Sequence, residues 1–534
     1  MLSSGSCSFQ DHILGLFSNS AEAEANYAAA RQRLLAALAN WRNQTANSLS
    51  PDPDSSSPTN LLDYFEQLER TVIRNSADLA SPLCMGHMSG IYPRFMALIG
   101  ELILSLNQNL VKREASPVLT QVELETLAAL HRLIYNQTSG FYLRHVQDHA
   151  STLGLVTSGG TLGNLTALWI ARNLSFMPRH DFPGIEAAGM TRALEHYGYE
   201  SAVIVGSRLM HYSMEKAAAL LGLGTQNVLL LPVDRDNRLE TSALQDCISD
   251  CATHRKRIIA VLGIAGTTEC GSIDPLQTIA EIARAGNIFF HVDAAWGGPL
   301  LFSQQHRRLL SGIEQADSVV LDGHKQMYLP VAASALLLRD PTAARAIEKH
   351  SHYMLQEGSG DLGRRSLEGS RNGAALFFHA ALRLIGEQGY GFLMEENLRK
   401  SRIMAELVRM RPEFELLSES QTNILLYRGL PLALRGRRMS PFSSEEHAVI
   451  NAFNERLQKQ QSQAGRTFVS RTTIALGNAS PAAPLVALRA VITNPLLQQH
   501  HMQSVLEDQV SIMAELENQA DRETSGCFAV HPVR

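Results

Sequence analysis

Hydrophobic and polar positions alternate in blocks between about residues 120 and 385. Short runs rich in β-branched residues, typical of buried strands, are separated by stretches that carry apolar residues at helical spacing. This alternation predicts an α/β fold with a mainly parallel sheet covered by helices. The predicted strands are Ser201–Val205, Ile258–Ile264, Ile288–Val292 and Ser318–Leu321, and the clearest helices are Met214–Leu221 and Leu276–Ala285.

The N-terminal part of the chain follows a different pattern. Residues Ala21–Trp41 carry Leu34, Leu35 and Leu38 at helical spacing, which predicts an amphipathic helix. The next segment, Asn43–Asn60, is dominated by Ser, Pro, Asp and Asn, a composition that cannot build a core and indicates an exposed linker.

The C-terminal third mixes long helical stretches with a few strands, among them Thr422–Tyr427 and Phe468–Leu476. We therefore expect a second, smaller α+β domain there. The pattern divides the chain into an N-terminal helical segment (1–120, with the linker at 43–60), a large α/β domain (121–385) and a small C-terminal domain (386–534).

Composition excludes several classes of protein. Hydrophobic residues make up 45% of the chain and charged residues 19%, with a net charge of −5, which argues against nucleic acid as a partner. No apolar run approaches the roughly 20 residues of a membrane helix, and a basic signal-peptide flank is absent, so we expect a cytosolic protein without membrane contact. Cys247, Cys251 and His254 lack a visible fourth ligand, so we predict no metal site.

Two residues that directly follow predicted strands carry the strongest chemical signal. Asp293 stands in His291–Trp296, and Lys325 stands in Asp322–Gln326. In open α/β sheets ligands bind beyond the carboxyl ends of the strands, where both residues are expected. Pyridoxal phosphate needs an amine to bind its aldehyde and a carboxylate to keep its ring nitrogen protonated. Lys325 and Asp293 together therefore indicate a pyridoxal phosphate site.

Other residues fit the same site but are weaker signals alone. The turn Gly159-Gly160-Thr161 opens a helical run and would offer backbone N–H groups to a phosphate, although many such turns bind nothing. His211 follows a predicted strand and could stack on a pyridine ring or simply start a helix. Thr268, after Gly266-Thr267, could line a cofactor or serve only the turn. The small Ala295 would let a ring approach the backbone beside Asp293.

These residues, in this order, resemble the group II pyridoxal-phosphate-dependent amino acid decarboxylases, and the resemblance runs from about Ser81 to Ile512. It implies the fold of aspartate aminotransferase (fold type I) and a homodimer whose active sites are shared between subunits. It also implies roles for individual residues. Lys325 binds the cofactor's aldehyde, Asp293 pairs with the ring nitrogen, His211 and Ala295 lie on the two ring faces, Gly159, Gly160, Thr161 and His324 surround the phosphate, and Thr268 lines the pocket.

The resemblance also bears on the substrate. Arg489 stands in a segment where glutamate-type members carry an arginine that binds a substrate carboxylate. The segments Cys84–Gly90, Asn107–Asn109 and Ser116-Pro117 are most similar to the bacterial aspartate 1-decarboxylases, which form β-alanine, a pantothenate precursor. An acidic L-amino acid, aspartate first, is the expected substrate. Glutamate, cysteine sulfinate and 2,4-diaminobutyrate remain alternatives.

One departure from the family concerns the last step of the reaction. Many members carry a loop tyrosine that returns a proton to Cα, but Gln356–Arg371 contains none and Tyr353 lies at its edge. Tyr353 or another acid must then act, or transamination and aldehyde formation compete. An aminotransferase, an aldehyde synthase and a catalytically silent relative are therefore the other hypotheses.

Overall fold

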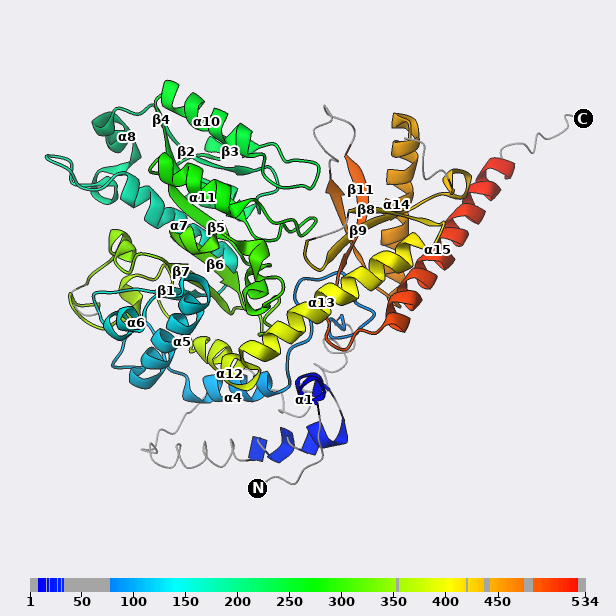
Figure 1. Cartoon of the computed structure of the whole chain (residues 1–534), viewed down its shortest axis with the longest axis horizontal. Helices are drawn as coiled ribbons and strands as arrows, with labels where there is room; N and C mark the ends of the chain where they lie inside the picture. The colour runs from blue at the N-terminus through cyan, green and yellow to red at the C-terminus, as the bar shows by residue number, and fades with distance from the viewer. Residues whose placement is uncertain are drawn as a thin grey trace, which may run out of the picture.

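A seven-stranded sheet forms the centre of the larger part of the molecule (Figure 1). The computed structural model describes residues 8–15, 17–18, 20–25, 27–29, 31–32, 77–351, 355–418, 421–436, 442–474 and 484–526. The strand order is β1-β7-β6-β5-β4-β2-β3, and only β7 runs against its neighbours. The strands are β1 (Gly154–Thr157), β2 (Ser201–Ser207), β3 (Val228–Leu231), β4 (Lys256–Ile264), β5 (Phe289–Asp293), β6 (Ser318–Asp322) and β7 (Ser334–Leu338).

The predicted α/β class with a mainly parallel sheet is confirmed, and each of the four strands predicted for this sheet is present within two residues of its expected ends. Strands β1, β3 and β7 were not predicted. β3 and β7 read Val-Leu-Leu-Leu and Ser-Ala-Leu-Leu-Leu, runs in which leucine and alanine favour a helix as readily as a strand, and β1 is only four residues long.

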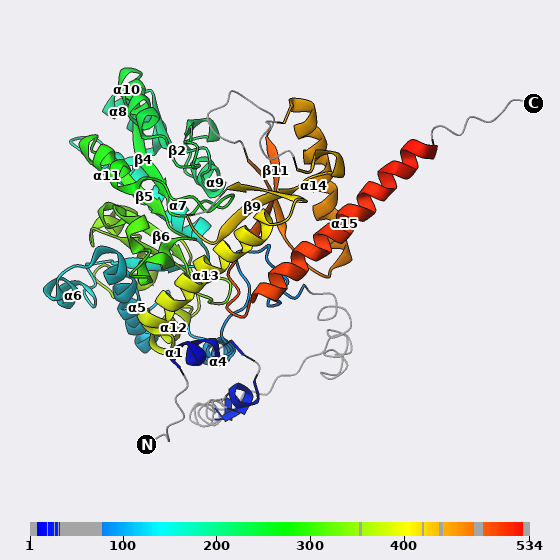
Figure 2. The same cartoon turned by 45° about the vertical axis from the view of Figure 1, so that its right-hand side comes forward.

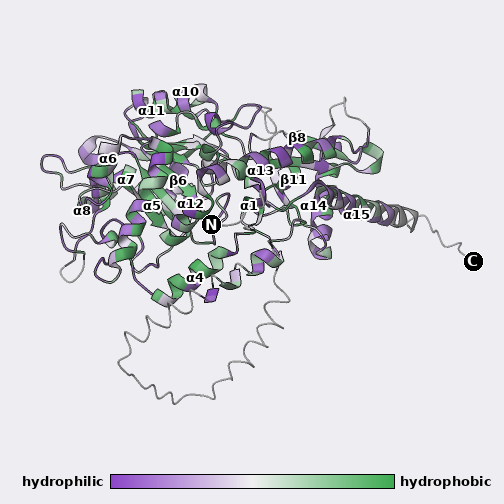
Figure 3. Cartoon of the chain, turned by 60° about the horizontal axis from the view of Figure 1, so that its bottom comes forward, coloured by the Kyte–Doolittle hydropathy of each residue, from purple (hydrophilic) through white to green (hydrophobic). Residues whose placement is uncertain are grey.

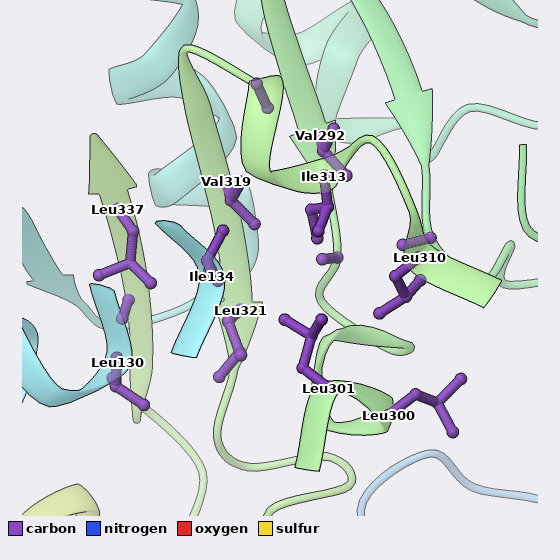
Figure 4. Close-up of a cluster of buried hydrophobic side chains, with 14 of the residues drawn as sticks. Leu130, Ile134, Val292, Leu300, Leu301, Leu310, Ile313, Val319, Leu321 and Leu337 are labelled. Atoms are coloured by element: carbon purple, nitrogen blue, oxygen red, sulfur yellow. The ribbon is translucent and has the colours of Figure 1, made fainter. Parts of the chain in front are cut away.

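Helices cover both faces of this sheet and bury its side chains. Figure 4 shows part of the core, where Leu130 and Ile134 of a covering helix face Val319, Leu321 and residues of neighbouring strands. The helices are α4 (Phe95–Leu106), α5 (Pro117–Tyr135), α6 (Ser139–His145), α7 (Gly160–Ser175), α8 (Ile185–Tyr197), α9 (Ser213–Leu220), α10 (Thr241–Thr253), α11 (Leu276–Ala285) and α12 (Ala375–Leu384).

Helix α7 crosses the large sheet. It packs against β1, β4, β5, β6 and β7, and its N-terminus lies where the parallel strands end. Ten of its 16 residues are buried, including Asn164 and Asn173. A polar residue near the start of α7 is therefore carried directly to the carboxyl ends of the central strands.

The C-terminal part contains helices and a smaller sheet, as predicted, and this sheet is antiparallel with the strand order β10-β11-β9-β8. Its strands are β8 (Phe414–Ser418), β9 (Ile424–Gly429), β10 (Ser470–Ile474) and β11 (Leu485–Val491). Three helices pack on it, α13 (Gly386–Arg409), α14 (Ser444–Ala464) and α15 (Gln499–Gly526). Figures 1 and 2 show the long α13 running from α12, beside the large sheet, to the small sheet.

The N-terminal part is described only in pieces. Helix α1 (Phe9–Gly15) was not predicted, and it contacts α13. Of the predicted helix Ala21–Trp41, residues 21–25, 27–29 and 31–32 are described and helical, whereas the linker Asn43–Asn60 and the end of the predicted strand Phe468–Leu476 lie outside the described residues. Among the helices that are described, none is both long and apolar enough to cross a membrane.

Helix α4 is hydrophobic along most of its length (Figure 3). It packs on α12, which in turn packs on α5. Leu104 of α4, Val118 of α5 and Leu384 of α12 keep 77%, 65% and 50% of their surfaces exposed. Large apolar side chains of these three adjacent helices therefore remain on the surface.

A buried ion pair joins α5 to the segment before α12. Both terminal guanidinium nitrogens of Arg371, Nη1 and Nη2, donate to the Glu123 carboxylate, at 2.7 and 2.6 Å, and the two side chains are only 8% and 1% exposed. We predict that Glu123→Ala lowers the free energy of unfolding by about 3–5 kcal/mol, because it leaves a buried guanidinium without its counter-charge.

Urea denaturation of the variant measures this loss. Glu396→Ala, which removes the partner of the exposed Arg399, is the matched control and should cost about 0–1 kcal/mol. Equal losses in the two variants would contradict the prediction.

Candidate active site

A cavity of about 260 Å³ lies beyond the carboxyl ends of the parallel strands. Segments that follow β1, β2, β4, β5 and β6 all contribute to its wall, as expected for an open α/β sheet. The sequence-predicted residues that line it are Gly159, Gly160, Thr161, His211, Thr268, Asp293, Ala295, His324 and Lys325. Of the predicted site residues, Arg489 is the exception and lies behind this wall.

Asp293 ends β5 and is 8% exposed, so its carboxylate needs internal hydrogen-bond donors. Asn164 Nδ2 donates to Asp293 Oδ2 at 2.9 Å, and the Ala295 backbone N–H donates to Oδ1 at 3.1 Å. Asn164 comes from α7, which reaches this point because it crosses the sheet. The two donors hold the carboxylate at one edge of the cavity in a defined orientation.

A second layer of hydrogen bonds orients Asn164 itself. His291 Nε2 lies 3.0 Å from Asn164 Oδ1, and His291 Nδ1 lies 2.7 Å from Ser318 Oγ. Burial lowers the pKa of His291 to about 4, although Asp293 and then Ser318 oppose the shift. The imidazole is therefore neutral at pH 7, donates from Nε2 to the amide oxygen and accepts the serine proton at Nδ1. Asn164 is thereby oriented with its NH₂ group toward Asp293.

Lys325 lies in a tight turn after β6. Its Nζ is 3.0 Å from Asp322 Oδ2, and Ser334 Oγ donates to the other carboxylate oxygen at 2.5 Å. The turn closes when the Leu329 N–H donates to the Gly323 carbonyl, and Tyr328 takes a positive φ of 58° within it. This backbone conformation is unusual for a bulky residue and points to a turn held by its surroundings. The turn keeps the lysine amine at the cavity.

His211 follows β2 and is fixed by Ser213. The Ser213 backbone N–H donates to His211 Nδ1 at 3.3 Å, and Ser213 Oγ lies 2.9 Å from the same nitrogen. Burial lowers the pKa of His211, Asp293 opposes this shift, and Lys325 adds to it. The ring is therefore mainly neutral at pH 7.

Helix α7 begins at the cavity without a side-chain cap at Gly159. Its first N–H groups and the positive end of its dipole therefore suit an anion. A Cβ built on Gly160 would lie 2.8 Å from both carboxylate oxygens of Asp322, so the close approach of this turn to β6 requires glycine.

These features fit pyridoxal phosphate. A lysine amine, an oriented carboxylate and an uncapped helix N-terminus face one cavity, which is the donor set that the aldehyde, the ring nitrogen and the phosphate require. Trp296 lines the same cavity, and its buried Nε1 has no hydrogen-bond partner among the described residues.

Arg489 lies on β11 of the small sheet and is 7% exposed. Its Nε donates to the carbonyl of Thr268 at 2.6 Å, and Nη1 donates to Ser470 Oγ at 3.2 Å and to the Gly86 carbonyl at 3.5 Å. Its Nη2 is buried and has no partner within the described part of the chain. Burial lowers the pKa of Arg489 to about 10, so the guanidinium remains charged at pH 7. Arg489 is therefore bonded to Thr268, a residue of the cavity wall.

Sequence reasoning missed several residues of the site. Asn164 stood in the Gly-rich motif but received no role, and its offset of four from Gly160 is the signal that places it one helical turn inside the same cavity. Asp322 stood in the lysine motif and directly precedes the turn. Met88 and Trp296 gave no chemical signal, because their contribution depends on how the small sheet meets the large one.

The cysteines considered for a metal lie elsewhere. Cys247 and Cys251 face each other on α10, and burial raises the pKa of the Cys247 thiol to about 12. In the described ranges, no group of three His, Cys, Asp or Glu side chains is placed to hold a metal ion.

The chain is similar to known proteins over most of its length. Residues 44–428 match the family model described as the pyridoxal-dependent decarboxylase conserved domain. The chain is 37% identical to "Aspartate 1-decarboxylase" of Aliivibrio fischeri over 86% of this chain and 85% of that protein. It is 31% identical to "L-2,4-diaminobutyrate decarboxylase" of Rhizobium meliloti over 71% of each chain. The crystal structure of mouse CSAD in apo form superposes with a TM-score of 0.73 at 25% identity, covering 88% of this chain and 91% of that one.

We predict that Asn164→Ala weakens cofactor binding roughly 10- to 100-fold, because losing a hydrogen bond to a buried charge costs about 1.5–3 kcal/mol. Titration of the apoprotein with pyridoxal phosphate, followed by absorbance, measures the change. Asn173→Ala is the matched control, because Asn173 is equally buried in α7 but bonds to Glu186 and the Ala346 carbonyl. If Asn164→Ala bound pyridoxal phosphate as tightly as the wild type, the hydrogen bond from Asn164 to Asp293 would not be needed for cofactor binding.

Proposed function

The chain belongs to the pyridoxal-dependent decarboxylase family and is a pyridoxal-phosphate-dependent amino acid decarboxylase, and from that premise we propose that it converts L-aspartate to β-alanine and carbon dioxide. The observation that carries the choice of substrate is the 37% identity to an aspartate 1-decarboxylase across nearly the whole chain. The β-alanine formed would supply pantothenate synthesis.

When bound, pyridoxal phosphate supplies a ring that withdraws electrons and stabilises negative charge at the substrate Cα. We propose that Lys325 holds the aldehyde and that Asp293 keeps the proton on the ring nitrogen. Support comes from the position of both groups in one cavity and from the two donors that orient Asp293. The remaining proposed cofactor contacts are His211 and Ala295 on the ring faces, Gly159, Gly160, Thr161 and His324 at the phosphate, and Thr268 in the lining of the pocket.

The chain's own groups also bear on proton movement. Asp322 Oδ2 lies 3.0 Å from Lys325 Nζ and positions the amine at the cavity. The proton that must return to Cα needs another donor. Tyr353, the sequence-based candidate, lies outside the described residues. Among described residues, the side chains that line the cavity and carry exchangeable protons include Tyr212, His211, His324 and Lys325.

Arg489 supports an acidic substrate. A buried guanidinium with an unpartnered Nη2 gains a charge-assisted hydrogen bond from a carboxylate, and its planar fork suits bidentate binding. The Thr268 carbonyl that it now binds belongs to the cavity wall, so a small movement of this loop would open the way to the substrate.

Glu269 favours a second candidate substrate. It follows Thr268, and its Oε2 is buried without a partner within the described residues. Burial raises the pKa of Glu269, although its own backbone N–H and the Arg489 charge oppose the shift. An ionised carboxylate here would suit the side-chain amine of L-2,4-diaminobutyrate, the substrate named for the Rhizobium relative. Arg489 therefore favours a negatively charged substrate side chain, whereas an ionised Glu269 favours a positively charged one.

We also propose a cytosolic homodimer with active sites shared between subunits, built from the three parts 1–120, 121–385 and 386–534. The exposed apolar side chains of α4, α5 and α12 support an interface on that face, because monomeric proteins rarely expose large contiguous apolar patches.

We predict that the holoenzyme releases carbon dioxide and β-alanine in equal amounts from L-aspartate, with a kcat/KM at least about tenfold above that for any other substrate. The panel contains glutamate, cysteine sulfinate, 2,4-diaminobutyrate and aromatic amino acids. Lys325→Ala should lose this activity and the pyridoxal that borohydride fixes to the chain, whereas Lys349→Ala, an exposed lysine, should keep both. A keto acid or aldehyde product would point to transamination or aldehyde synthesis, and a silent protein would show no cofactor absorbance.

The two charges beside Thr268 give a second prediction. Arg489→Gln should raise the KM for aspartate roughly 10- to 100-fold, because a charge-assisted hydrogen bond is worth about 1.5–3 kcal/mol. Glu269→Gln keeps the size of the side chain and removes its charge, so it should leave aspartate turnover intact and weaken any turnover of diaminobutyrate. If Arg489→Gln left turnover intact and Glu269→Gln raised the KM instead, 2,4-diaminobutyrate would be assigned as the substrate.

A further inference from the structure

A second cavity, of about 490 Å³, lies at the junction of the two sheets and shares no lining residue with the cofactor cavity. One side is formed by the segment after the short helix Gly298–Phe302, a second by the C-terminal half of α13, and a third by the start of β9. Figures 1 and 2 show α13 in this position between the two sheets. The walls of this second cavity therefore come from both the large-sheet and the small-sheet parts of the molecule.

Uncompensated positive charge lies around this cavity. Arg308 and Arg402, both exposed, line its rim, and within the described part of the chain neither side chain has an ion-pair or hydrogen-bond partner. The acidic lining residue, Glu406, is already paired with Arg409. Burial lowers the pKa of His306, Arg402 and Arg308 lower it further, and Glu395 opposes them. The positive charges of Arg308 and Arg402 therefore act on the His306 imidazole, which also lines the second cavity.

The deeper wall is apolar with a few polar groups. Leu309, Leu398 and Leu425 contribute aliphatic surface, and Thr422 and Gln421 bring a hydroxyl and an amide. A simple ion would leave the leucine surface uncovered, whereas an organic anion can place its charged group at the arginines and its body against the leucines. A phosphate monoester carries about −1.5 to −2 charges at pH 7 and suits paired guanidiniums.

The cavity is also connected to the active site. Gln421 Oε1 accepts a hydrogen bond from the Ile273 backbone N–H at 2.8 Å. Ile273 bridges to Ala265 and so closes the loop that carries Thr268, which lines the cofactor cavity and accepts from Arg489. A ligand that engages Gln421 would act on this loop through one hydrogen bond.

We propose that this second cavity binds a small organic phosphate and that its occupancy changes decarboxylation through the bond between Gln421 and Ile273. The proposal rests on the decarboxylase activity of the chain and does not depend on which amino acid is the substrate. A failed aspartate assay would therefore contradict only the proposed substrate, and a failed phosphate titration would contradict only the proposed second site.

Calorimetric titration of the holoenzyme at constant ionic strength tests the binding. Adenosine 5′-monophosphate and glycerol 3-phosphate are the probes, adenosine and inorganic phosphate are the controls, and an unchanged cofactor absorbance shows that the cofactor's own phosphate site stays filled. We expect at least one probe to bind at least tenfold more tightly than both controls. The double variant Arg308→Gln/Arg402→Gln should lose at least tenfold in affinity while keeping the wild-type melting temperature. Arg192→Gln, an exposed arginine on α8, should change nothing.

The activity assay tests the connection. A saturating probe should change kcat/KM of the wild type at least twofold with whichever amino acid the enzyme decarboxylates, and Gln421→Leu should bind the probe within threefold of the wild type but lose the activity change. The proposal is overturned if neither probe binds at 10 mM, if inorganic phosphate binds as tightly as the probes, or if the double variant binds normally. An activity change that persists in Gln421→Leu overturns the proposed connection.

Discussion

The structure of the site depends on the hydrogen bonds that satisfy and orient the buried Asp293 carboxylate. An unpaired buried carboxylate would take up a proton, and a neutral acid could not hold a proton on a pyridine nitrogen. Asn164 and the Ala295 backbone supply the donors, and neutral His291 with Ser318 fixes the amide that faces the carboxylate. The same helix that carries Asn164 begins at the cavity with free N–H groups. One helix thus carries both the amide that bonds to Asp293 and the N-terminus that opens at the cavity.

The second constraint is the junction between the two sheets. The loop with Thr268 belongs to the large sheet, yet Arg489 and Gln421 of the small sheet hold it from two sides. Cys270 of the same loop packs on the small sheet with Leu426 and Ala487. The residues proposed to choose the substrate therefore sit where the two parts meet, whereas the residues proposed to hold the cofactor sit on the large sheet alone. This separation suits a family in which one cofactor chemistry serves many amino acids.

Much of the large sheet could be predicted because β-branched strands and helical stretches alternate clearly along the chain. The convergence of Asp293 and Lys325 followed from that, since both residues come directly after parallel strands. Asn164 and Asp322 were harder, because their importance lies in hydrogen bonds to residues far away in sequence or across a turn. The position of Arg489 behind Thr268 could not be predicted, because it depends on packing between the sheets. The antiparallel β7 was missed because its leucines and alanines carry no strand preference.

The state of the cofactor's ring nitrogen tests the role of Asp293 most directly. Nitrogen NMR of the holoenzyme reconstituted with ¹⁵N-labelled pyridoxal phosphate reports whether that nitrogen is protonated. We expect the chemical shift of a protonated pyridine in the wild type at pH 7 to 8, and a change to the neutral value in Asp293→Asn. A neutral nitrogen in the wild type, or the same protonated shift in both proteins, would contradict the central role given to this carboxylate.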